Sequence, residues 1–266
     1  MNKKIILGLV VIAVLVLVGF NFLSNKNSDE QMLSSLEVIK ENGVIRIGTE
    51  GTYAPFTFYN DKNELTGFDV EIAREVAKRI GVEAEFIETK WDGMFAGLDS
   101  KRFDFVANQV TIKADRIEKY DFSSPYIKTR AVLVVHENND EITTFEDLQG
   151  KKSGQSLTSN LAELATSYGA EIVQIDGFNQ AIDLLLSERI DATINDRLSY
   201  LDFKVARPDA AIKVVAEEAT SSEAAFLFNK GNEELVAAVN KALEDMKSDG
   251  TYLEISERWF GDDVSK

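Results

Sequence analysis

The 266-residue chain contains no cysteine, one histidine and three prolines. Without cysteine it has no disulfide, no thiolate metal site, no cysteine nucleophile and no lipid attached through cysteine. Its one histidine, His136, excludes a three-histidine metal site and makes any Ser-His-Asp triad depend on that residue. Three prolines leave no room for long proline-rich disorder. We expect neither a metal nor a cofactor.

Positive charge is also scarce, with 29 Lys and Arg against 45 Asp and Glu and a net charge of -16. A field of that sign repels phosphate backbones, so nucleic acid is not an expected partner. The hydrophobic fraction of 44% is ample for the core of one large domain or two modest ones.

The N-terminal segment is predicted to direct export. Two lysines precede an apolar run over residues 5–23 that only Asn21 interrupts. A positive start followed by an apolar stretch is typical of export signals, and the run is near the lower length limit for crossing a bilayer. Residues 1–23 are thus expected to be a signal peptide or a membrane anchor, and 24–33 a polar tether. The protein would be periplasmic or at the cell surface, either free or held at the membrane by residues 5–23, and a monomer.

Strands and helices alternate along the rest of the chain. Strand–helix–strand repetition predicts mostly parallel sheets with helices on both faces. Hydrophobic spacing and Gly or Asn stop signals predict helices over 34–41, 68–80, 94–98, 144–148, 161–168, 179–187, 233–248 and 251–259. They predict strands over 44–48, 82–87, 103–107, 131–135, 171–175, 191–194 and 223–228, with loops at 49–55 and after 151–154.

The elements after residue 223 contain no complete βαβ unit, so we expect them to return to the first part of the fold. This predicts an α/β protein of two lobes, with the second lobe inserted in the first. Lobe 1 would comprise 34–126 and 221–266, and lobe 2 would comprise 127–220. Two chain crossings would join the lobes, and a ligand would bind in the cleft at the strand ends.

Several short segments carry a family resemblance through their order and spacing. They are GTEGTYAPFTFY at 48–59, TGFDVE at 66–71, WDGM at 91–94, NQVTIKADR at 108–116, YDFSSPY at 120–126, residues 150–160, NDRL at 195–198 and GTY at 250–252. Together they resemble the bacterial extracellular solute-binding proteins of family 3, the receptors of polar amino-acid ABC importers. NQVT with NDRL most resembles the cystine-binding branch.

The resemblance implies a type II periplasmic-binding clamshell that binds a free amino acid, with cystine favoured. The permease and ATPase of the importer would be separate chains. The family's arginine five residues after a threonine binds the ligand carboxylate, and Arg116 stands at that spacing from Thr111. A guanidinium suits this task because it offers two parallel donors. The alternative is a surface Arg116 paired with Asp115 or Glu118.

Asp196 is the candidate for the ligand ammonium. It follows an apolar strand, at the end where α/β sites gather. The alternative is an N-cap of a helix that begins at Arg197. Asn195 and Arg197 flank it and are expected to point elsewhere.

Tyr53 and Trp91 match positions where the family stacks aromatic rings over the ligand side chain. A second zwitterionic end of cystine would meet Glu50, Asn108 and Gln109. For most aromatic residues core packing is the alternative, and for Glu50 it is an exposed loop position.

The second lobe departs from the family pattern. Where members usually have Gly-Thr, the chain has Thr158-Ser159. Ser159 can supply a hydroxyl and Thr158 an amide to the carboxylate at a helix start. The alternative is simple capping of the helix before Leu161.

Two other classes of function remain open from the sequence. Cyclohexadienyl dehydratases resemble this family, and Glu50 with Asp196 could in principle form an acid–base pair. A ligand-binding sensory module is the other alternative. The intact set of carboxylate-binding and ammonium-binding residues favours a non-enzymatic receptor.

Overall fold

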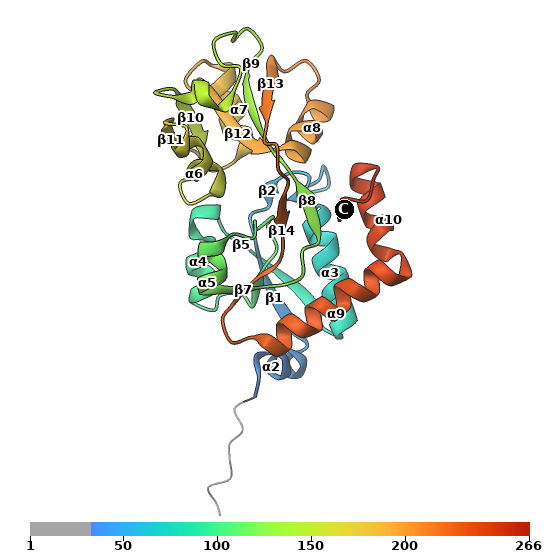
Figure 1. The fold of residues 1–266 in the computed structure, drawn as a ribbon. Coiled ribbons are helices and arrows are strands. Elements are labelled where there is room, and N and C mark those ends of the chain that lie inside the picture. The colour runs from blue at the N-terminus through green and yellow to red at the C-terminus, as the bar shows by residue number, and fades with distance from the viewer. Residues whose placement is uncertain (1–32) are drawn as a thin grey trace, which may run out of the picture. The chain divides into compact units, whose positions relative to one another are not determined.

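The computed structural model describes residues 33–266, and residues 35–266 form one compact unit. The predicted export segment, 1–23, lies outside the described residues, and so does the predicted tether except for its last residue, Leu33. In the part of the chain that is described, no helix is both long and apolar enough to cross a membrane. Figure 1 shows the elements with their labels.

The first sheet contains β1 (Val44–Thr49), β5 (Glu83–Glu88), β6 (Phe105–Val106), β7 (Tyr120–Phe122) and β15 (Leu227–Asn229). Their order is β5-β1-β6-β15-β7. Strand β1 pairs in parallel with β5 and β6, whereas β15 is antiparallel to β6 and β7. The sheet is therefore mixed, with one strand reversed.

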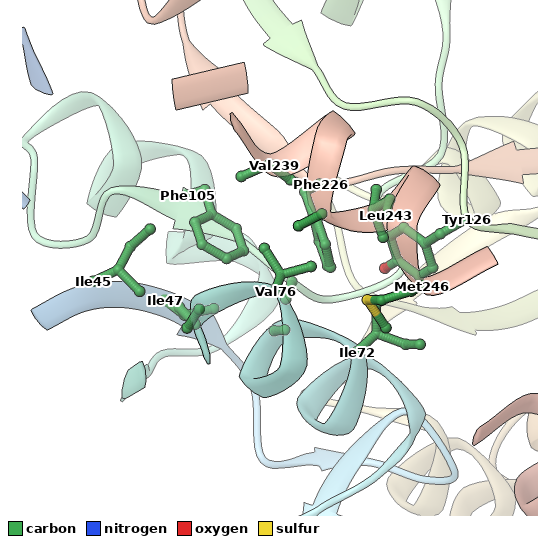
Figure 2. Close-up of a cluster of buried hydrophobic side chains, with 14 of the residues drawn as sticks. Ile45, Ile47, Ile72, Val76, Phe105, Tyr126, Phe226, Val239, Leu243 and Met246 are labelled. Atoms are coloured by element: carbon green, nitrogen blue, oxygen red, sulfur yellow. The ribbon is translucent and has the colours of Figure 1, made fainter. Parts of the chain in front are cut away.

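Alternation of side chains gives this sheet a core on each face. Phe226 and Phe228 belong to one core and Leu227 to the other. The first core is covered by α2 (Ser35–Asn42), α3 (Phe68–Ile80), α9 (Glu233–Asp249) and α10 (Thr251–Phe260). Figure 2 shows the middle of this core, where isoleucines of β1 face side chains of α3 and α9. The second core is covered by α4 (Trp91–Asp99), beside α5 (Ala114–Lys119).

The second sheet contains β9 (Ala131–His136), β10 (Lys152–Gln155), β11 (Glu171–Gln174), β12 (Ala192–Asp196) and β13 (Ile212–Glu217). Their order is β11-β10-β12-β9-β13, and only β9 is reversed. One face is covered by the 3-10 helix η1 (Phe145–Leu148) and α6 (Asn160–Ser167). The other is covered by α7 (Phe178–Leu186) and α8 (Arg197–Ala206).

A two-stranded antiparallel ribbon connects the two sheets. It pairs β8 (Ile127–Thr129) with β14 (Ser222–Ala224). Strand β8 leads into β9, and β14 leads into β15, which are the reversed strands of the two sheets. We call the parts built on the first and second sheets lobe 1 and lobe 2. The limits predicted between them, 126/127 and 220/221, fall beside the ribbon and stay predictions.

The α/β class is confirmed, and so is the helix predicted over 68–80, which ends at Gly81 in a left-handed C-cap. The single strand predicted over 223–228 is wrong. It is two strands, because Phe226 exchanges hydrogen bonds with Ser123 between them. The loop expected at 49–55 contains part of a small sheet of β2 (Thr52–Tyr53), β3 (Thr57–Tyr59) and β4 (Leu65–Thr66).

Gly67 before α3 provides a test of this packing. Its φ is +128°, and a Cβ built there would lie 2.2 Å from the carbonyl oxygen of Phe56. We expect Gly67→Ala to lower the free energy of unfolding by at least about 2 kcal/mol. Gly81→Ala is the control, because its φ is +90° but no atom lies within 4 Å of the added Cβ. Urea unfolding should show the larger loss for Gly67→Ala, and equal losses would contradict the close contact.

Candidate functional site

Two adjoining pockets lie between the lobes. Pocket A has a cavity volume of about 80 Å³ and pocket B about 250 Å³. Both are lined by Tyr53, Gln109, Asn160 and Leu161, so they form one region. Neither alone reaches the roughly 300–1,000 Å³ of typical small-molecule sites. A ligand of ordinary size would therefore use both.

The carboxyl ends of parallel strands supply much of the lining. Glu50 follows β1, Asn108 lies two residues beyond β6, Gln155 ends β10 and Ile175 follows β11. Asn195 is the next-to-last residue of β12. This is where α/β folds place their ligands, since the loops after parallel strands gather at that edge.

Eight of the ten predicted site residues line the pockets. Glu50, Trp91, Asn108 and Ser159 line pocket A, Thr111 and Asp196 line pocket B, and Tyr53 and Gln109 line both. Arg116 and Thr158 line neither. Sequence reasoning did not select Gln155, Ser156, Ile175, Gly177 and Phe178, which line pocket A from lobe 2. Their signal was their position after the 151–154 segment, at the end of the strand predicted over 171–175, or just before the helix predicted over 179–187.

Glu50 and Asn108 form a reciprocal pair. The Asn108 side-chain amide donates to a Glu50 carboxylate oxygen at 2.6 Å, and the Glu50 backbone N–H donates to Asn108 Oδ1 at 2.8 Å. Burial raises the pKa of Glu50 to about 7, and nearby Asp92 acts in the same direction. Glu50 is therefore not the exposed loop glutamate of the alternative interpretation.

Asp196 is both the N-cap of α8 and a lining residue of pocket B. Its carboxylate accepts a hydrogen bond from Leu198 N at 2.7 Å. Burial raises its pKa to about 6. It forms no ion pair within the described part of the chain. A buried carboxylate of this kind is costly unless a cation reaches it.

The neighbours of Asp196 differ from each other. Arg197 points away, as expected, and pairs with Glu217 at 2.5 Å. The expectation for Asn195 is wrong, because it lines pocket A and accepts a hydrogen bond from Tyr53 Oη at 3.0 Å. The short Asn side chain at the strand end leaves its amide beside the pocket.

Arg116 lies directly behind the pocket walls. Its guanidinium carbon is 5.5 Å from the ring centroid of Trp91 and 5.2 Å from that of Phe95, and Nη1 donates to the Thr111 carbonyl at 3.0 Å. The side chain is buried, and burial lowers its pKa. The predicted alternative is not seen, since Asp115 pairs with Lys113. Arg116 itself has no ion pair among residues 33–266.

Thr158 and Ser159 are engaged in other contacts. Ser159 Oγ accepts from Ala162 N at 3.0 Å and caps α6, as the alternative interpretation held. Thr158 donates from its backbone N–H and its hydroxyl to Asp92 at 3.0 and 2.9 Å. Gln174 also donates to Asp92, at 3.3 Å. These bonds join α4 of lobe 1 to lobe 2.

Further bonds cross between the lobes. Lys90 pairs with Asp176 at 2.7 Å, and Lys113 pairs with Glu163. Ser199 Oγ donates to the carbonyl of Ala54 at 2.7 Å. The lobes are thus in contact and closed around the pockets.

Unsatisfied polar atoms concentrate at the pockets. In residues 33–266, four buried side-chain nitrogen or oxygen atoms lack a hydrogen-bond partner, and three belong to the lining residues Trp91, Gln109 and Thr129. The Thr129 hydroxyl acts on the pKa of Asp196 without making a bond of normal geometry. Buried polar groups are rarely left unpaired, so their concentration here marks a place for a polar ligand.

The fold and the pockets define a two-lobed α/β binding protein with an interlobe site. Residues 45–262 match the model of the bacterial extracellular solute-binding proteins, family 3, and the chain belongs to that family. The predicted family and type II fold are thereby confirmed. Membership of an extracellular family also implies export.

Several relatives that are named for an amino-acid ligand are close in sequence. The chain is 49% identical over 229 residues to the L-cystine-binding protein TcyA of Bacillus subtilis, covering 86% of this chain and 85% of TcyA. The L-cystine solute receptor of Neisseria gonorrhoeae, in its unliganded open conformation, is 43% identical. Its alignment covers 88% of this chain and all of that one, with a TM-score of 0.58. An ancestral arginine-binding protein bound to arginine is 38% identical, with a TM-score of 0.78 and coverage of 82% and 98%.

The raised pKa of Asp196 predicts how stability varies with pH. Its value of about 6 in the folded protein lies above the ordinary 3.8, so between about pH 4 and 6 the folded state binds more protons than the unfolded chain. Stability contributed by this group therefore falls as pH rises through that window. Asp196→Asn keeps an oxygen to cap α8 but cannot ionise.

We expect Asp196→Asn, without ligand, to show a shallower fall in melting temperature from pH 4 to 7 than the unmodified protein. Asp209→Asn is the control, because it removes the same charge from an exposed position. Calorimetric melting across this range makes the measurement. An unchanged slope in Asp196→Asn would show that the carboxyl is not held protonated by burial.

Proposed function

We propose that this protein is an extracytoplasmic receptor that binds a free amino acid, with L-cystine favoured, and delivers it to an ABC importer. The observation that carries the proposal is a pair of buried opposite charges, Arg116 and Asp196, that lack ion-pair partners in residues 33–266 and flank the pockets. An amino-acid zwitterion supplies the missing partner of each. The L-cystine-binding relatives support the choice of ligand.

In the proposed complex Arg116 binds the α-carboxylate with help from Thr111 and from Ser159 and Thr158 at the start of α6. To do so its guanidinium leaves the Thr111 carbonyl, and Thr158 shares or releases its bonds to Asp92. Asp196 binds the α-ammonium. The aromatic rings of Tyr53 and Trp91 enclose the sulfur-bearing middle of the ligand.

Cystine has a second zwitterionic end, and Glu50, Asn108 and Gln109 are proposed to meet it. Glu50 is half-buried beside Asn108 and has no ion-pair partner among the described residues, and this second end brings an ammonium. The two pockets together accommodate an elongated ligand better than either does alone.

The comparisons also support closure of the lobes on ligand. The open N. gonorrhoeae receptor has a higher sequence identity to this chain than the arginine-bound protein has, yet its TM-score is lower. A rigid rotation of two lobes that stay internally unchanged produces such a difference. The closed arrangement is therefore proposed as the ligand-bound form of the receptor.

The remaining parts of the proposal concern the surroundings of the receptor. The permease and ATPase are separate chains, and the receptor acts as a monomer. Residues 5–23 keep it at the membrane or are removed on export. Its pockets perform no reaction, in keeping with relatives that are binding proteins.

Calorimetry with L-cystine, cysteine, glutamine, glutamate, arginine and histidine tests the proposal. We expect tight binding of L-cystine at one molecule per chain, with the other amino acids weaker. Tight binding of arginine with none of cystine would overturn the ligand while leaving an amino-acid receptor. No binding of any amino acid, together with turnover of a cyclohexadienyl dehydratase substrate, would overturn both.

Arg116→Ala is expected to weaken amino-acid binding by roughly 2–5 kcal/mol, because the ligand carboxylate would be desolvated and unpaired. Arg116→Lys should recover only part, since an ammonium cannot make the two-pronged contact. Arg197→Ala serves as the control, as it removes a nearby arginine that points away. The same calorimetric assay applies, and an Arg116→Ala affinity within about threefold of the unmodified protein would refute the assignment.

A further inference from the structure

Asp69 is a fully buried carboxylate that the binding scheme above does not use. It lies in the first turn of α3, within the TGFDVE segment, and is 0% exposed. Three donors converge on it: Gln109 N at 2.7 Å, Gln109 Nε2 at 2.7 Å and Tyr126 Oη at 3.0 Å. It forms no ion pair within residues 33–266. Burying an unpaired carboxylate costs free energy, and the three hydrogen bonds to Asp69 offset that cost.

One side of this cluster forms the pocket wall. Gln109 lines both pockets, and its φ of +51° lies in the left-handed region that is uncommon for residues other than glycine. Asp69 holds the backbone N–H and the side-chain amide of Gln109 together. The strained conformation of Gln109, and with it the wall between the pockets, depends on these two bonds.

The other side of the cluster reaches the ribbon. Tyr126 immediately precedes β8, and its backbone N–H donates to the carbonyl of Ala224 in β14 at 3.1 Å. Its hydroxyl is held by Asp69. Tyr252 of α10 donates its own hydroxyl to the carbonyl of Tyr126 and makes no bond to Asp69.

We propose that Asp69 is a positioning residue that couples the ligand-lining residue Gln109 to the ribbon entered at Tyr126. Asp69 fixes the pocket wall and the start of β8 in one arrangement, so ligand affinity depends on it although it lines neither pocket. The proposal rests on the proposed amino-acid-binding function.

The chemistry requires a carboxylate at this position. An asparagine offers one acceptor oxygen where an aspartate offers two, and its NH₂ group would face a donor. Either a donor of Gln109 loses its partner or the Gln109 amide turns, which alters the wall in both cases. Tyr126→Phe is the milder change, since it removes only the link to the ribbon.

For each variant we compare two measurements, the affinity by calorimetry and the melting temperature without ligand. The ligand is L-cystine, or whichever amino acid in the panel above binds the unmodified protein. We expect Asp69→Asn to lose about tenfold or more in affinity and Tyr126→Phe about fivefold, because each change removes a hydrogen bond to a charged group. Tyr252→Phe is the matched control, because it removes another buried tyrosine hydroxyl, one that bonds to the Tyr126 carbonyl and not to Asp69. It should bind within about twofold of the unmodified protein. Tyr126→Phe and Tyr252→Phe should melt at similar temperatures.

Equal affinity losses in the two tyrosine variants, or losses that follow only the melting temperature, would overturn the coupling and leave Asp69 a structural residue. If Asp69→Asn does not fold, the pair of tyrosine variants still decides. Binding by the unmodified protein is read separately. Its absence for every amino acid would overturn the proposed function and this role with it, whereas binding with unaffected variants would overturn this role alone.

Discussion

The antiparallel pairing of β8 with β14 is the constraint on which the rest of the structure depends. It brings the chain into lobe 2 and back into lobe 1 side by side, joined over Ile127–Thr129 and Ser222–Ala224. Each crossing therefore enters its sheet against the direction of the other strands, which accounts for the single reversed strands β9 and β15. The carboxyl ends of β1, β6, β10, β11 and β12 then meet across the pockets. A short ribbon of this kind also concentrates any change of lobe orientation into a few residues.

Burial of ionisable side chains at the pockets lowers the stability of the protein without ligand. Burial raises the pKa values of Glu50 and Asp196 to about 7 and 6, and it lowers that of Arg116. None of these groups has an ion-pair partner among the described residues. Natural proteins keep such costs at functional sites, because the ligand that neutralises them gains the corresponding free energy. In the proposed site the opposite signs of Arg116 and Asp196 would select a zwitterion, whereas a site for a simple anion or cation would need only one of them.

Elements were predicted correctly where a long stretch of neighbouring residues carried the pattern. The helix over 68–80 has an apolar face and a glycine stop, and both features survive in the structure. Sequence reasoning could not predict that β14 and β15 are separate, since that depends on Ser123, about a hundred residues away. The same limit applies to the site. Motif spacing selected eight lining residues, but the stacking of Arg116 on Trp91 and Phe95 and the engagement of Thr158 by Asp92 are tertiary contacts. The role of Asn195 was missed because its bond to Tyr53 crosses between the lobes.

The contacts that close the lobes are weak where they are exposed. Asp92 and Thr158 lie at the surface, and Lys90 and Asp176 keep 71% and 57% of their side chains exposed. Exposed pairs of this type contribute about 0–1 kcal/mol each. The stronger unsatisfied interactions are buried at the pockets and need a ligand to be made. Under the proposed function, weak exposed contacts between the lobes would not hold the empty receptor closed. The ligand would then supply most of the free energy of closure, and the apparent affinity would fall in proportion to the fraction of receptor in the binding-competent state.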